Sequence, residues 1–156
     1  MTLRKDSEPV AEQPAIRPPR ADDRPAWDEL WRGYLRFYRS RLEPEVTELT
    51  WARLLDPTVQ PHGLVAELDG RLVGLAHYLF HPSTWSAASY CYLEDLFTAP
   101  EARGRGVGRA LIEAVARAAE AAGASRLYWH TQEFNAEGRA LYDTLARRTS
   151  FIVYER

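Results

Sequence analysis

Several common features are scarce or missing in this chain. Cys91 is its only cysteine, so no internal disulfide can form, and a reducing compartment is expected. No apolar run approaches the roughly 20 residues that a membrane span needs, and the polar N-terminus lacks the apolar core of a signal peptide. The formal net charge is −2, so the chain lacks the excess of basic residues that nucleic-acid-binding proteins have. These absences predict a cytoplasmic protein with no membrane or nucleic-acid partner.

The remaining composition is that of one globular domain. The chain has 156 residues, of which 46% are hydrophobic and 12% aromatic, which is enough to bury a core. Residues 1 to 13 are polar with little to bury, and we expect a flexible tail there. No repeat or linker divides residues 14 to 156, so the sequence predicts a single domain over that range.

Hydrophobic spacing and turn residues predict an α/β (α+β) fold. Asp69 and Gly70 separate two apolar runs, which is a strong signal for a two-residue hairpin turn. The expected strands cover 15–17, 63–68, 71–80, 90–97, 126–131 and 151–154, with a loop at 81–89, and the expected helices cover 22–38, 44–55, 107–122 and 136–145. This β-α-α-β-β-β-α-β-α-β order is typical of a mixed sheet with helices packed on it.

A glycine-rich run, Arg103 to Gly108, connects an apolar strand to the long helix that begins near Val107. Its three glycines allow a ligand to approach the backbone closely, and a helix start offers free N–H groups and the positive end of the helix dipole. With Arg103, Arg105 and Arg109, this arrangement predicts a cradle for phosphate oxygens. The run lacks the Gly-Lys-Ser/Thr of a P-loop, and Arg109 stands where a dinucleotide-binding loop needs its third glycine.

Two adjacent carboxylates interrupt the strand before this run. Neighbouring strand residues point to opposite faces, so we expect one of Glu94 and Asp95 to face a cleft or a buried network. An aromatic stripe at helical spacing over 27–38 is expected in the core. Its more solvent-exposed edge, at Tyr34, Phe37 and Tyr38, is a candidate wall for a substrate pocket.

No metal site is expected from the histidines and the cysteine. His77 and His81 are four residues apart, but they fall on a strand and the loop after it, where this spacing does not form a metal-binding pair. Cys91 is interpreted as a small buried hydrophobe, because a cysteine nucleophile needs a partnered histidine.

These features follow one family's order and spacing. The matching segments are Tyr92 to Phe97, Pro100 with Glu101, Arg103 to Gly108, the long helix, Leu127 to Thr131, Asn135, and Leu141 with Tyr142. Over about residues 14 to 156 the sequence resembles the GCN5-related N-acetyltransferase (GNAT) superfamily, and it is most similar to the diamine and Hpa2-like branch. The resemblance implies the GNAT fold, with a mixed, mostly antiparallel sheet and flanking helices, and an acetyl-CoA-dependent N-acyltransferase.

The resemblance also implies a set of cofactor-binding residues. Backbone groups of Leu96, Phe97 and Thr98 would pair with the pantetheine arm of acetyl-CoA, and Asn135 would bind that arm or order the following helix. The N–H groups of the glycine-rich run would hold the pyrophosphate, assisted by Arg109. The residues of that run are Arg103, Gly104, Arg105, Gly106, Val107 and Gly108.

The implied reaction is direct attack of a primary amine on the thioester in a ternary complex. An amine is mostly protonated at neutral pH, so a base must first take a proton; Glu94 is the candidate and Asp95 the weaker one. Tyr142 stands where the family has its general acid for the departing thiolate. The two carboxylates and the aromatic edge with Tyr34 and Tyr38 favour a small cationic, polyamine-like acceptor.

Other interpretations stay open. Tyr142 at helical spacing also fits a core tyrosine, Glu94 fits an anchor for a substrate ammonium, and Asn135 fits a helix cap alone. The acceptor could instead be an amino acid, or a protein lysine or N-terminus. A non-catalytic acyl-CoA sensor is a further alternative, and a nucleic-acid-binding module that uses the arginines is a weaker one.

The C-terminus departs from the family. Ala146 to Phe151 replaces the family's usual Gly-Phe after the last helix, so the last hairpin is expected to be shortened to one strand. Family dimers often use this region. The expected assembly is therefore a homodimer whose geometry the sequence leaves open.

Overall fold

A computed structural model describes residues 11–156; residues 1–10, which make up most of the predicted tail, lie outside the described part. The strands are β1 (Ala15–Arg17), β2 (His62–Leu68), β3 (Arg71–Ser83), β4 (Ser86–Thr98) and β5 (Arg126–Trp129). The helices are α1 (Arg24–Phe37), α2 (Pro44–Leu55), α3 (Val107–Ala121) and α4 (Ala136–Leu145), with short 3₁₀ turns η1 (Ala21–Asp23) and η2 (Pro100–Ala102).

The described strands form one five-stranded sheet in the order β1-β2-β3-β4-β5. Neighbouring strands are antiparallel except β4 and β5, which run parallel. The predicted α/β fold with a mixed, mostly antiparallel sheet is therefore confirmed. No helix of residues 11–156 is long and apolar enough to cross a membrane.

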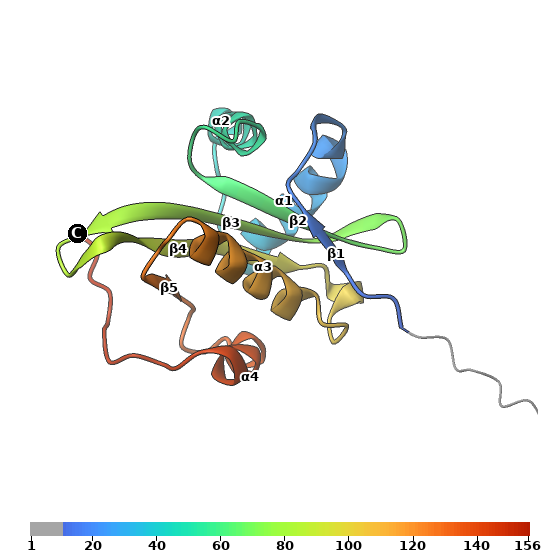
Figure 1. Cartoon of the computed structure of the whole chain (residues 1–156). Helices are drawn as coiled ribbons and strands as arrows, with labels where there is room; N and C mark the ends of the chain where they lie inside the picture. The colour runs from blue at the N-terminus through green and yellow to red at the C-terminus, as the bar shows by residue number, and fades with distance from the viewer. Residues whose placement is uncertain (1–10) are drawn as a thin grey trace, which may run out of the picture.

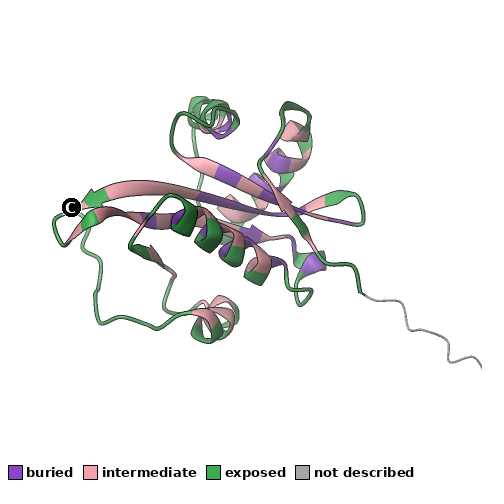
Figure 2. Ribbon diagram, viewed as in Figure 1, coloured by how far each residue is buried: buried purple, intermediate pink, exposed green. Residues whose placement is uncertain are grey.

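Helices cover both faces of the sheet: α1 and α2 lie on one side, and α3 and α4 on the other (Figure 1). Apolar residues recur along α3 at helical spacing, and Val107, Leu111 and Val115 are buried against the sheet. On the opposite face Trp27 and Trp31 of α1 are buried with residues of α2, β2, β3 and β4. The two cores lie on opposite faces of the sheet, and the centre of the sheet is buried between them (Figure 2).

The Asp69–Gly70 hairpin turn is confirmed, because both residues adopt positive φ angles, 51° and 73°, as a tight two-residue turn requires. The predicted loop at 81–89 is wrong. β3 continues to Ser83 and β4 begins at Ser86, and these two residues pair directly. Pro82 falls at an irregularity in this ladder, where its missing N–H leaves no regular bond unmade.

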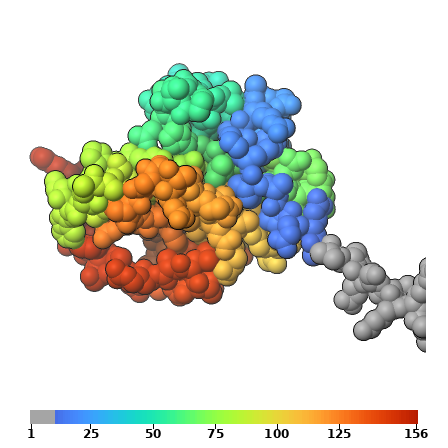
Figure 3. Space-filling model, viewed as in Figure 1, coloured from blue at the N-terminus to red at the C-terminus, as the bar shows by residue number. Residues whose placement is uncertain are grey.

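The predicted last strand over 151–154 is also wrong. Residues after α4 form neither helix nor strand, and Phe151, Ile152, Val153 and Tyr154 are 73%, 73%, 69% and 88% exposed. This run has β propensity, but a strand also needs a neighbour with which to exchange hydrogen bonds. Figure 3 shows this C-terminal segment, in red, with an opening between it and the rest of the molecule.

A β-bulge interrupts the pairing of β3 and β4 next to Asp95. The ladder joins His77 to Asp95 and Tyr78 to Leu93, which leaves Glu94 as a bulge without a partner. On one side of the bulge Leu93 packs in the core with α3, and on the other side Phe97 packs in the core with α1. The bulge therefore reverses which face of the sheet the alternate residues of β4 occupy.

Candidate active site

The glycine-rich run forms the turn into α3. Gly104 and Gly106 adopt left-handed φ angles of 76° and 79°, which glycine reaches without steric cost. Gly106 is the N-cap of α3 and has no side chain to cap it, and the Ala110 N–H donates to the Gly106 carbonyl at 3.0 Å. The N–H groups of the helical residues before Ala110 have no acceptor within the helix and point beyond its N-terminus. With the helix dipole they form an anion-binding end.

The edge of β4 next to this turn is open. β4 pairs with β5 only from Tyr90 with Arg126 to Leu93 with Trp129, although β4 itself continues to Thr98. The last residues of β4, 96–98, therefore pair with β3 but have no partner on β5 among the described residues. Such an edge can exchange hydrogen bonds with an extended ligand.

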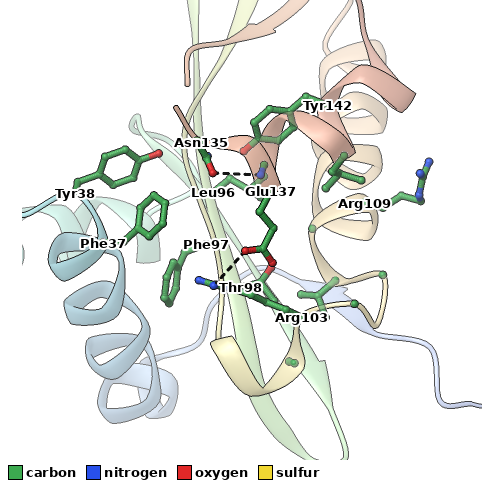
Figure 4. A pocket seen from close by; sticks show the side chains of 17 residues that line it. Phe37, Tyr38, Leu96, Phe97, Thr98, Arg103, Arg109, Asn135, Glu137 and Tyr142 are labelled. Atoms are coloured by element: carbon green, nitrogen blue, oxygen red, sulfur yellow. Dashed lines mark hydrogen bonds and ion pairs between the residues drawn. The ribbon is translucent and has the colours of Figure 1, made fainter. Parts of the chain in front are cut away.

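A cavity of about 350 Å³ joins this edge to the start of α3, a size usual for small-molecule sites (Figure 4). It brings together most of the predicted site residues from four elements. Its lining includes Tyr38, Leu96, Phe97, Thr98, Arg103, Gly104, Gly106, Val107, Gly108, Arg109, Asn135 and Tyr142. Among the predicted cofactor-binding residues Arg105 is the exception, because its guanidinium Nη1 lies 3.3 Å from Asp69 Oδ2, away from the cavity. The predicted substrate-binding residues Tyr34, Glu94 and Asp95 do not line this cavity either.

Two arginines border the cavity. Arg103 Nη1 lies 3.6 Å from Glu137 Oε2 on α4 (Figure 4), and Arg109 donates from Nη2 to Thr144 Oγ1 at 2.9 Å. Glu137 is exposed, so this ion pair is weak and can exchange for a ligand phosphate. The sequence analysis did not single out Glu137, since an exposed glutamate in a first helical turn carries no distinctive signal.

Tyr142 projects from α4 into the same cavity. Its ring packs edge-to-face on Trp129, with ring centroids 5.5 Å apart, and its hydroxyl points toward that of Tyr38 (Figure 4). Burial raises the pKa of Tyr142 to about 12, and the neighbouring Tyr38 adds to this. At neutral pH the phenol therefore keeps its proton and can donate it.

A second cavity, of about 450 Å³, lies on the α1/α2 side of the sheet. It is lined by Trp31, Leu42, Thr50, Arg53, Gln60, Pro61, His77, Leu79, Glu94 and Asp95. The expectation that Glu94 and Asp95 point to opposite faces is wrong. Both line this cavity, because the bulge at Glu94 breaks the alternation of β4.

Glu94 has no hydrogen-bond partner among the described residues, whereas Asp95 has a buried one. Partial burial raises the pKa of the Glu94 carboxyl, the charge of Asp95 raises it further, and His77 opposes the shift. A carboxylate with a raised pKa is a better proton acceptor at neutral pH than an ordinary one. The two neighbouring carboxylates thus differ in their surroundings.

A buried chain of hydrogen bonds supports Asp95. The Trp27 indole Nε1 donates to His77 Nε2 at 3.2 Å, and His77 Nδ1 lies 2.9 Å from Asp95 Oδ2. Trp27 is fully buried and His77 is 1% exposed. The sequence analysis gave neither residue a role in the site, because their pairing depends on contacts between α1, β3 and β4.

The aromatic edge of α1 lies between the two cavities. Tyr34 stacks on Trp31 at 5.1 Å, and burial, then the Asp95 carboxylate, raises the pKa of its phenol far above the ordinary value. Burial and Asp95, in the same order, also raise the pKa of Tyr38, which lines the first cavity. Tyr38 thus lies close to Asp95 on one side and Tyr142 on the other.

Asn135 caps α4. Its Oδ1 accepts from the Gly138 N–H at 3.2 Å and its Nδ2 donates to Thr131 Oγ1 at 3.0 Å. It also lines the first cavity, so the capping interpretation is confirmed and a cofactor contact stays a prediction. Among residues 11–156, no group of three or more His, Cys, Asp or Glu is arranged to hold a metal ion.

Comparison with known proteins shows that the chain is similar to acetyltransferases. The model of the "Acetyltransferase (GNAT) family" matches residues 25–146. The chain is 38% identical to the D-amino-acid N-acetyltransferase HPA3 of Saccharomyces cerevisiae over 136 residues, or 86% of this chain and 84% of the yeast protein. It is 36% identical to the thialysine N-epsilon-acetyltransferase of Sus scrofa over 95 residues, or 56% of this chain and 55% of the pig protein.

Solved structures share the fold. The structure of AAC(6')-Iy in complex with the bisubstrate analogue CoA-S-monomethyl-acetylneamine superposes with a TM-score of 0.79, covering 93% of this chain and 98% of the other at 19% identity. At this identity the similarity concerns the architecture of the sheet and its helices.

Proposed function

The chain belongs to the acetyltransferase (GNAT) family, and from that premise we propose that it transfers the acetyl group of acetyl-CoA to the primary amine of a small acceptor. It is an acyltransferase enzyme, and its relatives include acetyltransferases of D-amino acids and thialysine. One observation carries the proposal: the free N–H groups at the start of α3, the open edge of β4 and the Tyr142 side chain border one cavity.

The cavity suits the pyrophosphate and the pantetheine arm of acetyl-CoA. The N–H groups between Arg103 and Arg109 bind the pyrophosphate, with Arg105 contributing through its backbone because its side chain pairs with Asp69. Backbone groups of the β4 edge at 96–98 pair with the pantetheine arm as an added strand would. Asn135, on the cavity wall, is available to the same arm.

The catalytic groups divide the proton transfers between them. Glu94 takes a proton from the acceptor ammonium, and the neutral amine forms the new C–N bond at the thioester carbonyl. As the C–S bond breaks, Tyr142 gives its proton to the sulfur. The second proton on the acceptor nitrogen leaves through solvent and restores the Tyr142 phenol. Glu94 then gives its proton to solvent, so one proton is released overall. The raised pKa values of both groups suit these directions.

The second cavity is the proposed acceptor site, and a small cationic, polyamine-like amine is the favoured substrate class. Glu94 and Asp95 provide two negative charges on one wall, and Tyr34 and Tyr38 are close enough to Asp95 for its charge to raise their phenol pKa values. Carboxylates and the faces of aromatic rings both attract an ammonium.

An amino acid is the second candidate acceptor. Arg53 of α2 lines the same cavity and has no ion-pair or hydrogen-bond partner for its guanidinium within residues 11–156, so it can bind an acceptor carboxylate. The 38% identity to a D-amino-acid N-acetyltransferase supports this class as well. A protein lysine or N-terminus, and a non-catalytic acyl-CoA sensor, are less favoured.

Release of CoA thiol from acetyl-CoA, measured across a panel of acceptors, tests the proposal. The panel contains diamines, polyamines, D- and L-amino acids and a short peptide. CoA release with at least one amine is expected, and an Arg53→Gln variant should raise KM for amino acids while leaving KM for diamines unchanged. Binding of acetyl-CoA without CoA release from any acceptor would refute catalysis and favour the sensor.

Three further proposals concern the whole chain. Residues 14 to 156 act as one N-acetyltransferase domain. The chain forms a homodimer, which the open edge of β5 and the exposed apolar run at 151–154 support, because each lacks a partner among the described residues. The cytoplasmic location rests on the lone Cys91, which is buried and free. Sedimentation analysis and cell fractionation test the last two.

A further inference from the structure

The hydrogen bonds of Trp27 fix the tautomer of His77. An indole N–H can only donate, so His77 Nε2, 3.2 Å from the Trp27 Nε1, must accept and carries no proton. The ring proton is therefore on Nδ1 and is donated to Asp95 Oδ2 at 2.9 Å. The other tautomer would set two N–H groups against each other in a site where His77 is only 1% exposed.

The surrounding rings leave the imidazole one orientation. Trp31 and Trp27 lie against it with ring centroids 5.2 and 5.9 Å away. A ring flip would exchange Nδ1 and Nε2 for carbon atoms and would leave Trp27 Nε1 and Asp95 Oδ2 without their partners. The position of the donor beside Asp95 is therefore set by α1, not by the active-site surface.

The bulge gives the two carboxylates different degrees of freedom. Asp95 pairs across the ladder with His77, so its backbone and its side chain are held by the same residue. Glu94 is the unpaired bulge residue, and its carboxylate has no hydrogen-bond partner among the described residues. One carboxylate of the acceptor cavity is thus fixed and the other is free to move.

We propose that His77 is a positioning residue for the acceptor: in the tautomer that Trp27 imposes, it holds the Asp95 carboxylate toward the second cavity, where Asp95 binds the acceptor ammonium and Glu94 takes its proton. This inference rests on the proposed amine acetyltransfer. In the step concerned, the ammonium N–H bond breaks, its electron pair stays on nitrogen, and the proton goes to Glu94 while Asp95 remains ionised.

Two substitutions separate positioning from packing. In His77→Asn the amide nitrogen replaces Nδ1 and can donate to Asp95, but Trp27 loses its acceptor. In His77→Gln the amide oxygen replaces Nε2 and accepts from Trp27, but Asp95 loses its donor. We expect His77→Asn to keep KM for the amine within about threefold, and His77→Gln to raise it about 10- to 100-fold, the usual factor for losing a hydrogen bond to a charged group.

Acetyl-CoA affinity and thermal stability complete the measurement. Both variants should bind acetyl-CoA as the wild type does, since His77 does not line the first cavity. Asp95→Asn should reproduce the amine KM of His77→Gln. Equal amine KM values for the two His77 variants, or a larger KM for His77→Asn, would overturn the inference, and so would amine KM values that follow the melting temperature.

A second readout does not depend on turnover. Long-range ¹H–¹⁵N NMR correlations of the His77 ring should show a protonated Nδ1 and a bare Nε2 in the wild type, and Trp27→Phe should allow the other tautomer to appear. A protonated Nε2 in the wild type would overturn the inference by itself. If the wild type acetylates no amine, the proposed function fails, whereas the NMR result still decides which nitrogen faces Asp95.

Discussion

Replacing Gly106 by alanine tests whether the turn into α3 binds the coenzyme. Gly106 has a φ of 79°, and a Cβ built on it meets no atom within 4 Å, so the added methyl group acts only through the backbone. A non-glycine residue in this left-handed conformation costs about 1–2 kcal/mol. If the turn relaxes away from that conformation, CoA must restore it on binding, and the affinity should fall about 5- to 30-fold, at 1.4 kcal/mol per factor of ten.

Gly123, just beyond α3, is the matched control. Its φ is 72°, and a Cβ there also meets nothing within 4 Å. Gly106→Ala and Gly123→Ala should therefore lower the free energy of unfolding, measured in urea, by similar amounts. Calorimetric titration with CoA should show weaker binding for Gly106→Ala alone. If the two variants bind CoA equally well, the start of α3 does not hold the pyrophosphate and the proposed site is wrong.

Three other outcomes follow from the structure. Tyr142→Phe should lower kcat about 10²- to 10⁴-fold, the usual worth of a general acid, with unchanged acetyl-CoA affinity, whereas Tyr154→Phe, at an 88% exposed site, should change neither. Glu94→Gln should remove the acid limb of the pH profile of kcat/KM, and in the wild type this limb should lie above pH 4.5 because the pKa of Glu94 is raised. The folded state disfavours ionised Glu94, so the substitution should not lower the free energy of unfolding at pH 7. A loss of stability would contradict this reasoning. Asp23→Asn should lower the free energy of unfolding at pH 7 by about 2 kcal/mol, because it breaks the 2.7 and 2.9 Å bonds from Arg17 that hold the Asp23 pKa low. In urea titrations the difference should begin to shrink as the pH falls below about 4, the unfolded-state pKa, and should vanish only below the lowered pKa of the folded state.

Features written in short stretches of sequence could be predicted. The Asp69–Gly70 turn and the apolar stripe of α3 depend on a few adjacent residues, and both occur as expected. The turn at the glycine-rich run could also be predicted, because the left-handed φ angles of Gly104 and Gly106 and the start of α3 are local properties. Most residues that the family resemblance assigned to the coenzyme lie in this run or shortly before it in the sequence, and they line one cavity.

Features that depend on register and on distant contacts could not be predicted. The bulge at Glu94 exists only relative to β3, so strict alternation placed the two carboxylates on opposite faces. The proposed role of His77 depends on Trp27, 50 residues earlier, and on Asp95, 18 residues later. Arg53 lines the second cavity because of the packing of α2, and no short sequence motif indicates this. The expected strand at 151–154 had the right propensity but no neighbour.

The bulge in β4 bears on how such a site can arise. Because the ladder pairs Asp95 with His77 and Leu93 with Tyr78, removing Glu94 would leave every other cross-strand pair of β4 in its present register. The proposed base thus occupies a position that the pairing of β3 with β4 does not need. A single-codon insertion into this hairpin would be enough to create it, and a single-codon deletion would remove the proposed base while the strands keep their pairing.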